Sequence, residues 1–222
     1  MKKIIASLVA AAAVALPVLS DPLKDNQFNT MHSMGCMLLR ECKDGVHKIE
    51  SIASIASEYP NIDYSIVADE FHTMLLALEQ VGVGVFLADS KYFPVGHRGV
   101  YHTVSNNFFL NKEHMGSTAY LMQVMRHEGW HAAQDCMAGT IENSLIAIIK
   151  PEDEVPMIWR VMAERTYPES AVPWEAEAGW AGRTEKMTME ALQSCARGTM
   201  WTDYEPTPMT REWLVENGYL TK

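Results

Sequence analysis

Two histidines and a glutamate occur together in the segment His127-Glu128-Gly129-Trp130-His131. On a helix, residues four apart project from the same face, so the imidazoles of His127 and His131 can bind one Zn²⁺. Glu128, between them, stays free to take a proton from water that the ion activates. A motif this short also arises by chance in roughly two of every hundred chains of this composition, so its surroundings have to support it.

A catalytic zinc site needs a third protein ligand and an open position for water. One common arrangement places glycine and histidine three and six residues after the second histidine, but here Gln134 and Met137 occupy those positions. A carboxylate further along the chain must therefore supply the third ligand. Glu175 is the preferred residue and Glu177 is the alternative. The two point in different directions on a helix, so only one of them is expected to bind.

Two helices must position these side chains. The first is predicted over residues 117–137, because Ser117 or Thr118 can accept hydrogen bonds from the free backbone N–H groups of a helix start. The second is predicted from Pro173 to about residue 196, because proline suits the first turn of a helix. The metal site would then lie where these two helices meet.

Short runs of β-branched and aromatic residues precede the first helix. They predict strands at residues 83–87, 99–103 and 107–110, separated by turn-forming residues. The sequence therefore predicts an α+β fold, mainly helical, with a small sheet before the helix that carries the two histidines.

Apolar residues at helical spacing predict three further helices. They span residues 46–57, residues 65–81 with a cap at Asp63 or Ser65, and residues 155–165. In the last of these, Ile158, Trp159 and Met162 are expected to face the protein interior, and the first two helices are expected to serve packing rather than chemistry.

The amino terminus begins with Met1-Lys2-Lys3, followed by an apolar run from Ile4 to Leu16. This order is typical of a secretory signal peptide, with cleavage expected after Ser20. An uncleaved membrane anchor is the alternative, but the run is shorter than the about 20 residues that cross a bilayer. We expect one domain over residues 21–222, exported and without a membrane span.

The chain of 222 residues contains 18 Lys and Arg against 28 Asp and Glu, a formal net charge of −10. Loss of Lys2 and Lys3 with the signal peptide would lower this charge to −12. Phosphate backbones are bound by clustered basic side chains, and the sequence has no such cluster. Nucleic acid is therefore not an expected partner.

The four cysteines are an even number in a chain expected to leave the cytoplasm, so two disulfides are predicted. Of the three possible connectivities we favour Cys36–Cys42 with Cys136–Cys195, because the first pair is local and the second ties two late helices. An alternative is a zinc site formed by Cys36 and Cys42 together with His32 and His47.

Over residues 100–195 the sequence resembles the zincin metallopeptidases, in particular the gluzincin-like group, whose third zinc ligand is a glutamate on a later helix. Glu175-Ala176-Glu177-Ala178 is similar to the segment that opens with this ligand, and it matches with Glu175 as the ligand. Residues 107–111 look like the edge strand above the active-site cleft. Where some of these families carry an aspartate that supports a histidine ligand, this chain has Gly179, so Asp135 and Glu177 are the candidates for that support.

The resemblance implies an exported zinc-dependent peptidase acting on a peptide or protein substrate. Glu128 would be the general base that takes the proton of the zinc-activated water and then the acid that delivers it to the leaving amine. Tyr167, His102 and His114 are all candidates for stabilising the oxyanion. The alternative function is an exported, non-enzymatic binding protein on a zincin-like scaffold, with a structural metal or none.

Overall fold

The computed structural model describes residues 34–42 and 44–221. Four strands form one mixed sheet, in the order β1-β2-β4-β3. β1 and β2 are antiparallel, β2 and β4 parallel, and β4 and β3 antiparallel. The strands are β1 (Val46–Lys48), β2 (Gly84–Ala88), β3 (Gly99–His102) and β4 (Asn107–Asn111). The three predicted strands are confirmed, and with them the α+β fold.

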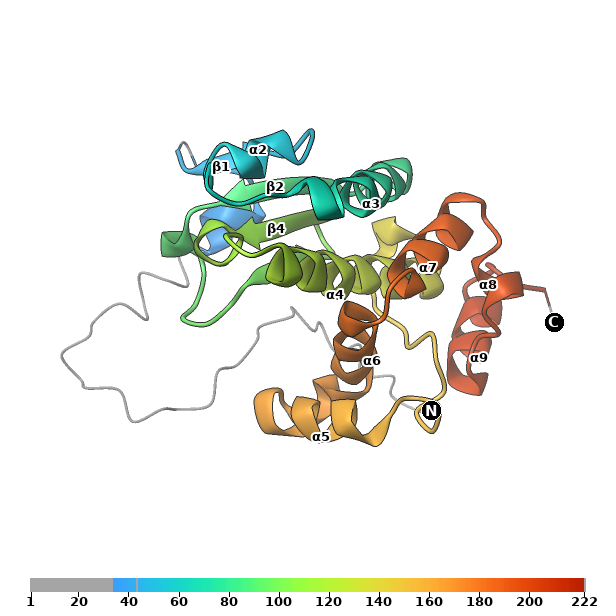
Figure 1. Cartoon of the computed structure of the whole chain (residues 1–222). Coiled ribbons are helices and arrows are strands. Elements are labelled where there is room, and N and C mark those ends of the chain that lie inside the picture. The colour runs from blue at the N-terminus through green and yellow to red at the C-terminus, as the bar shows by residue number, and fades with distance from the viewer. Residues whose placement is uncertain (1–33, 43, 222) are drawn as a thin grey trace.

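Helices make up most of the remaining described structure. They are α2 (Ala53–Ala56), α3 (Ala68–Gln80), α4 (Thr118–Met137), α5 (Met157–Thr166), α6 (Val172–Arg183), α7 (Met187–Ala196), α8 (Met200–Asp203) and α9 (Pro208–Glu216). In Figure 1, α4 runs between the sheet on one side and α6 on the other, with α7 packed along its second half. Within the described part of the chain, no helix has both the length and the apolar character needed to cross a membrane.

Helix α4 is the central element of the fold, and its predicted bounds are confirmed. Ser117 caps its start, since the Ser117 hydroxyl accepts from the backbone N–H of Tyr120. Trp130 is fully buried on this helix, among residues from α3, α6, α7 and the sheet. A helix packed on several sides can present polar groups in a fixed geometry, because its neighbours hold their side chains in place.

The helix predicted over residues 46–57 is wrong in its first half. His47 and Lys48 lie in β1, opposite Leu87 and Phe86 of β2, and only a single helical turn, α2, remains at 53–56. Pairing with the edge of β2 outweighs the helical periodicity, because strand formation depends on the neighbouring strand more than on local preference.

The helix predicted from Pro173 to about residue 196 is two helices. α6 ends at Arg183, and Lys186 adopts a left-handed conformation with φ of 68° before α7 begins. The hydroxyl of Thr184 donates to the carbonyl of Trp180, 2.9 Å away. Such side-chain bonds to the backbone compete with helix continuation.

Two further expectations about packing are wrong. Ile158 and Met162 of α5 are 59% and 51% exposed, so only Trp159 of the three packs against neighbouring apolar residues. The segment Asn107–Asn111 is not an edge strand, because β4 lies between β2 and β3 and all five of its residues are buried. The edge strand beside α4 is β3.

Both predicted disulfides are confirmed. Cys36 bonds to Cys42, and Cys136 at the end of α4 bonds to Cys195 at the end of α7. The alternative zinc site at Cys36 and Cys42 is therefore excluded, because a disulfide sulfur cannot act as a thiolate ligand. Two disulfides are compatible with an exported protein. The predicted signal peptide, residues 1–20, and His32 lie outside the described residues.

Candidate metal centre

The candidate site lies where α4 and the first turn of α6 meet. Pro173 occupies the start of α6 and places Glu175 in its first turn, as the sequence predicts. Gly182, further along α6, allows close packing: a Cβ there would lie 3.1 Å from the backbone oxygen of Gln123 and 3.3 Å from Cβ of His127. The small side chains of α6 thus bring its carboxylate within reach of the two histidines.

His127, His131 and Glu175 converge on one point. Oε2 of Glu175 lies 3.4 Å from Nε2 of His127 and 3.6 Å from Nε2 of His131. All three candidate ligand atoms lie within 4.8 Å of one another. Tetrahedral zinc with bonds of 2.0–2.2 Å holds its ligand atoms about 3.3–3.6 Å apart. The two measured separations match that geometry.

The buried carboxylate of Glu175 shows that these residues fit a cation. Its Oε2 is buried and has no hydrogen-bond partner among the described residues. Burying a charge is costly, the two imidazoles lie 3.4 and 3.6 Å from this oxygen, and an ion shared with them would compensate the cost. A metal bound by all three side chains therefore satisfies the one polar atom that the protein leaves unpaired here.

The pKa values of His131 and Glu175 are both shifted by their proximity to each other. Burial lowers the pKa of His131, but the Glu175 carboxylate, together with Glu128 and the bond to Gln134, outweighs burial and raises that pKa to about 9. Conversely, burial raises the pKa of Glu175, and the two histidines outweigh it and hold that pKa well below its usual range. Each group stabilises the charged form of the other, so the Glu175 carboxylate favours a positive charge at the imidazoles, carried by a proton or by a metal ion that replaces it.

Glu177 is not part of this group, but it is linked to His131 through Gln134. Nδ1 of His131 bonds to Oε1 of Gln134 at 2.8 Å, and Nε2 of Gln134 donates to Oε2 of Glu177 at 2.7 Å. Glu177 is 1% exposed and also accepts from the indole of Trp130 and the backbone N–H groups of Ile149 and Lys150. The chain His131–Gln134–Glu177 orients the imidazole, which is the role expected for an outer partner of a metal ligand.

Asp135 and Glu177 are the two candidates for supporting a histidine ligand. Only Glu177 does so, and it acts through Gln134. Sequence reasoning missed Gln134, although its position three residues after His131 on the same helix face was a usable signal. Asp135 contacts neither histidine through a hydrogen bond in the described structure. Its Oδ2 instead accepts from the hydroxyl of Tyr101 at 2.8 Å.

Glu128 lies on the neighbouring face of α4, against β3. Its Oε2 accepts the backbone N–H of Tyr101 at 2.8 Å, and the residue is 9% exposed. Gly99 permits this approach, because a Cβ there would lie 2.5 Å from Val124 and 3.1 Å from Cγ of Glu128. Tyr101 therefore fixes Glu128 through its backbone and is itself fixed to α4 through Asp135.

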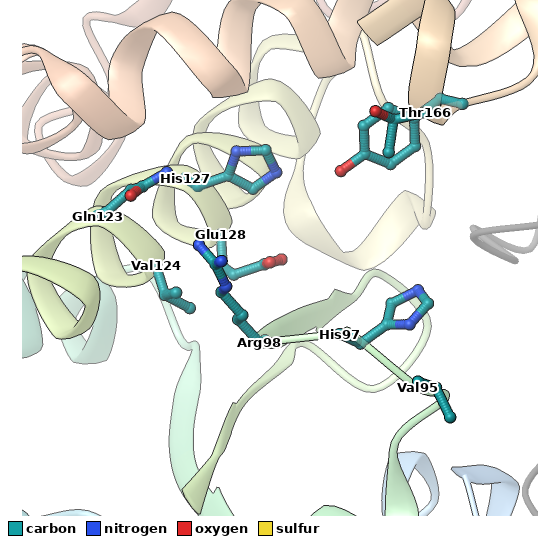
Figure 2. A pocket seen from close by; sticks show the side chains of 11 residues that line it. Val95, His97, Arg98, Gln123, Val124, His127, Glu128 and Thr166 are labelled. Atoms are coloured by element: carbon teal, nitrogen blue, oxygen red, sulfur yellow. The ribbon is translucent and has the colours of Figure 1, made fainter. Parts of the chain in front are cut away.

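A cavity of about 410 Å³ opens beside these residues (Figure 2). Figure 2 shows His127 and Glu128 emerging from α4 on one side, with His97 and Arg98 on the segment opposite. The lining residues are Val95, Gly96, His97, Arg98, Gly99, Gln123, Val124, His127, Glu128, Thr166 and Tyr167. The cavity can admit an extended ligand to the face on which Glu128 and the metal group lie.

Of the three residues considered as oxyanion donors, only Tyr167 lines this cavity. Burial raises the pKa of Tyr167, and the negative charges of Glu175 and Glu128 raise it further. The phenol therefore keeps its proton at neutral pH and can donate it. The ring of His102 bonds instead to the hydroxyl of Ser105, and neither His102 nor His114 reaches the cavity.

The site therefore combines two imidazoles and one carboxylate in a metal-binding arrangement, a further carboxylate beside it, and a cavity that gives access to both. Comparisons with protein-family models, with curated proteins and with solved structures found no match to this chain. What can be concluded about function consequently rests on the geometry of the described residues.

Proposed function

We propose that this protein is an exported zinc-dependent peptidase. The observation that carries the proposal is the convergence of His127, His131 and Glu175 on one point, with His127 and Glu128 both lining the adjoining cavity. Two histidines and one carboxylate leave one position open on a tetrahedral ion, as catalytic zinc requires. Export is supported by the two disulfides, together with the signal peptide expected at residues 1–20.

Zinc at this site would supply Lewis acidity, which polarises a carbonyl and makes a water molecule acidic near neutral pH. The protein's own contribution begins with Glu128. One of its carboxylate oxygens is held by the N–H of Tyr101, which fixes the orientation of the group. The other oxygen takes the proton of the attacking water and afterwards gives it to the leaving amine.

Tyr167 is proposed as the donor to the oxyanion. Its raised pKa keeps the hydroxyl protonated, and it lines the cavity together with His127 and Glu128. A donor that is already in place costs no reorganisation when negative charge develops on the carbonyl oxygen. The Gln134–Glu177 pair meanwhile keeps the His131 ring oriented toward the metal position.

The proposal is tested with zinc-loaded mature protein and a pool of mixed-sequence peptides, whose cleavage is followed by mass spectrometry. Glu128→Gln is expected to lower kcat by about a hundredfold or more, because proton transfer by a positioned group contributes on that order. Zinc content and melting temperature should remain at wild-type values. Glu79→Gln, which changes an exposed glutamate on α3, is the matched control and should retain full activity.

Undiminished hydrolysis by Glu128→Gln would contradict the assignment of the general base. The second candidate function is an exported binding protein with a structural metal, and the bond between Glu128 and Tyr101 favours it because it already engages that carboxylate. One zinc per chain with no turnover of any peptide by the wild-type protein would establish this second function in place of the first.

A further inference from the structure

Arg98 stands on the wall of the cavity opposite α4, directly before β3. Its side chain reaches across to α4, where the guanidinium lies over the ring of Tyr120, 4.5 Å from the centroid. Arg98 takes part in none of the ion pairs found among the described residues. Arg98 is thus an exposed cation at the cavity, without a carboxylate partner among the described residues.

The charge balance of the site makes this cation significant. Among the residues that line the cavity, Arg98 is the only arginine or lysine. At the site itself, the two carboxylates Glu128 and Glu175 would balance one divalent ion. Arg98 then leaves the cavity with positive charge in excess, and such a cavity attracts and orients an anionic group.

The direction of β3 indicates which part of a peptide would reach Arg98. β3 is the edge strand of the sheet, and Tyr101 directs its N–H away from β4, toward Glu128. An extended peptide lying beside this edge would run antiparallel to β3, while the N–H of Tyr101 stays bound to Glu128. Such a peptide would run from the His102 end toward Gly99, so its carboxyl-terminal part would lie at Arg98.

We propose that Arg98 binds a carboxylate on the carboxyl-terminal side of the cleaved bond and so determines specificity. This inference rests on the proposed function and adds the substrate class, namely peptides that carry a carboxylate just beyond the scissile bond. The carboxylate belongs either to the free carboxyl terminus of the peptide or to an Asp or Glu side chain. Arginine suits both, because its planar guanidinium can donate two parallel hydrogen bonds to one carboxylate.

The test compares kcat/KM of the zinc-loaded mature protein on matched peptides. One arm uses N-acetylated hexapeptides without Asp or Glu, with a free or an amidated carboxyl terminus. The other arm uses amidated peptides with Glu or Gln at each position in turn. In at least one arm the wild type should prefer the charged peptide by about tenfold to a hundredfold, the usual effect of a hydrogen bond to a charged group.

Arg98→Gln should remove this preference by lowering kcat/KM for the charged peptide alone, and Arg98→Lys should restore part of it. Arg183→Gln, at an exposed position outside the cavity, is the matched control and should keep the full preference. A variant that slows all peptides equally would show a structural role for Arg98 and overturn the inference. Equal rates on charged and neutral peptides in both arms of the wild-type experiment would overturn it as well.

A binding measurement distinguishes an error in this inference from an error in the proposed function. Retention of the same peptides on immobilised, zinc-loaded Glu128→Gln protein should show the same carboxylate preference, dependent on Arg98. Carboxylate-dependent retention without hydrolysis by the wild type would refute the peptidase proposal and leave the inference standing. Hydrolysis at equal rates with and without the carboxylate would refute the inference and leave the peptidase proposal standing. A lack of carboxylate-dependent retention would count against the inference whether or not the wild type hydrolyses peptides.

Discussion

Two cavities of similar size lie beside α4, and only one of them adjoins the candidate site. The cavity at residues 95–99 has a volume of about 410 Å³, and the second, near the Cys136–Cys195 disulfide, has about 480 Å³. Among the described residues, Glu142 is the only ionisable side chain that lines the second cavity. The first is lined by Arg98, His97, His127 and Glu128, and it adjoins Glu175. A functional site is thus identified by convergent polar groups rather than by size.

The two cavities also differ in how their walls are held. At the first, Glu128 is held by the backbone N–H of Tyr101, and His131 of the adjoining metal group is held by Gln134. The second is bounded mainly by apolar and small residues and by the disulfide. Substitutions that remove polar groups should consequently affect metal binding and activity at the first cavity only.

The sharpest test of this difference is Tyr167→Phe, which removes one hydroxyl from the first cavity. We expect kcat to fall by about a hundredfold with little change in KM or zinc content, since the donor acts mainly on charge that develops during the reaction. Steady-state kinetics on a cleaved peptide provides the measurement. At the second cavity, Glu142→Gln should leave kcat unchanged, and a comparable loss in that variant would remove the distinction.

A smaller effect is expected when the outer partner of His131 is removed. Gln134→Leu should lower zinc affinity by about tenfold to a hundredfold, because the imidazole loses the bond that orients it. Competition with a chelator of known affinity measures the change. Gln80→Leu makes the same substitution at the second cavity, and this variant should bind zinc with wild-type affinity. Equal zinc affinities of the two variants would show that the Gln134–Glu177 pair has no part in metal binding.

The smallest effect concerns stability rather than activity. Burial raises the pKa of Asp135 to about 8, against an ordinary value of 3.8, while the Tyr101 hydroxyl acts in the opposite direction. Between these values the folded protein holds a proton that the unfolded chain has released, so the free energy of unfolding contributed by this group falls as pH rises from about 4 to about 8. Below this window the contribution is complete.

Asp135→Asn keeps an acceptor for Tyr101 but cannot ionise. Denaturant unfolding of the zinc-loaded protein at several pH values should therefore show a shallower decline in the variant than in the wild type across that window. Identical pH profiles for the two proteins would mean that Asp135 has an ordinary pKa in the folded state.

The elements that carry the metal group could be predicted from the sequence because local signals define them. Ser117 marks the start of α4, the spacing of His127 and His131 defines their common face, and Pro173 places Glu175 in the first turn of α6. The choice of Glu175 over Glu177 relied on a resemblance, and the geometry agrees with it.

The parts that could not be predicted depend on contacts between distant segments. β1 forms because Val46–Lys48 finds the free edge of β2, and β3 rather than β4 is the edge beside α4 because of the parallel pairing of β2 with β4. The bond between Glu128 and Tyr101 and the bond between Gln134 and Glu177 likewise join residues far apart in the chain. Local sequence patterns do not specify which distant segments meet, because strand formation depends on the neighbouring strand and on burial.

The central claim, that His127, His131 and Glu175 together bind one metal ion, is tested most directly by the metal content of the purified mature protein. Elemental mass spectrometry after preparation without chelators should find about one zinc per chain in the wild type and in Glu128→Gln. Glu175→Ala should contain almost none, whereas Glu177→Ala should still bind zinc, more weakly. No metal in the wild type, or an undiminished content in Glu175→Ala, would contradict the account.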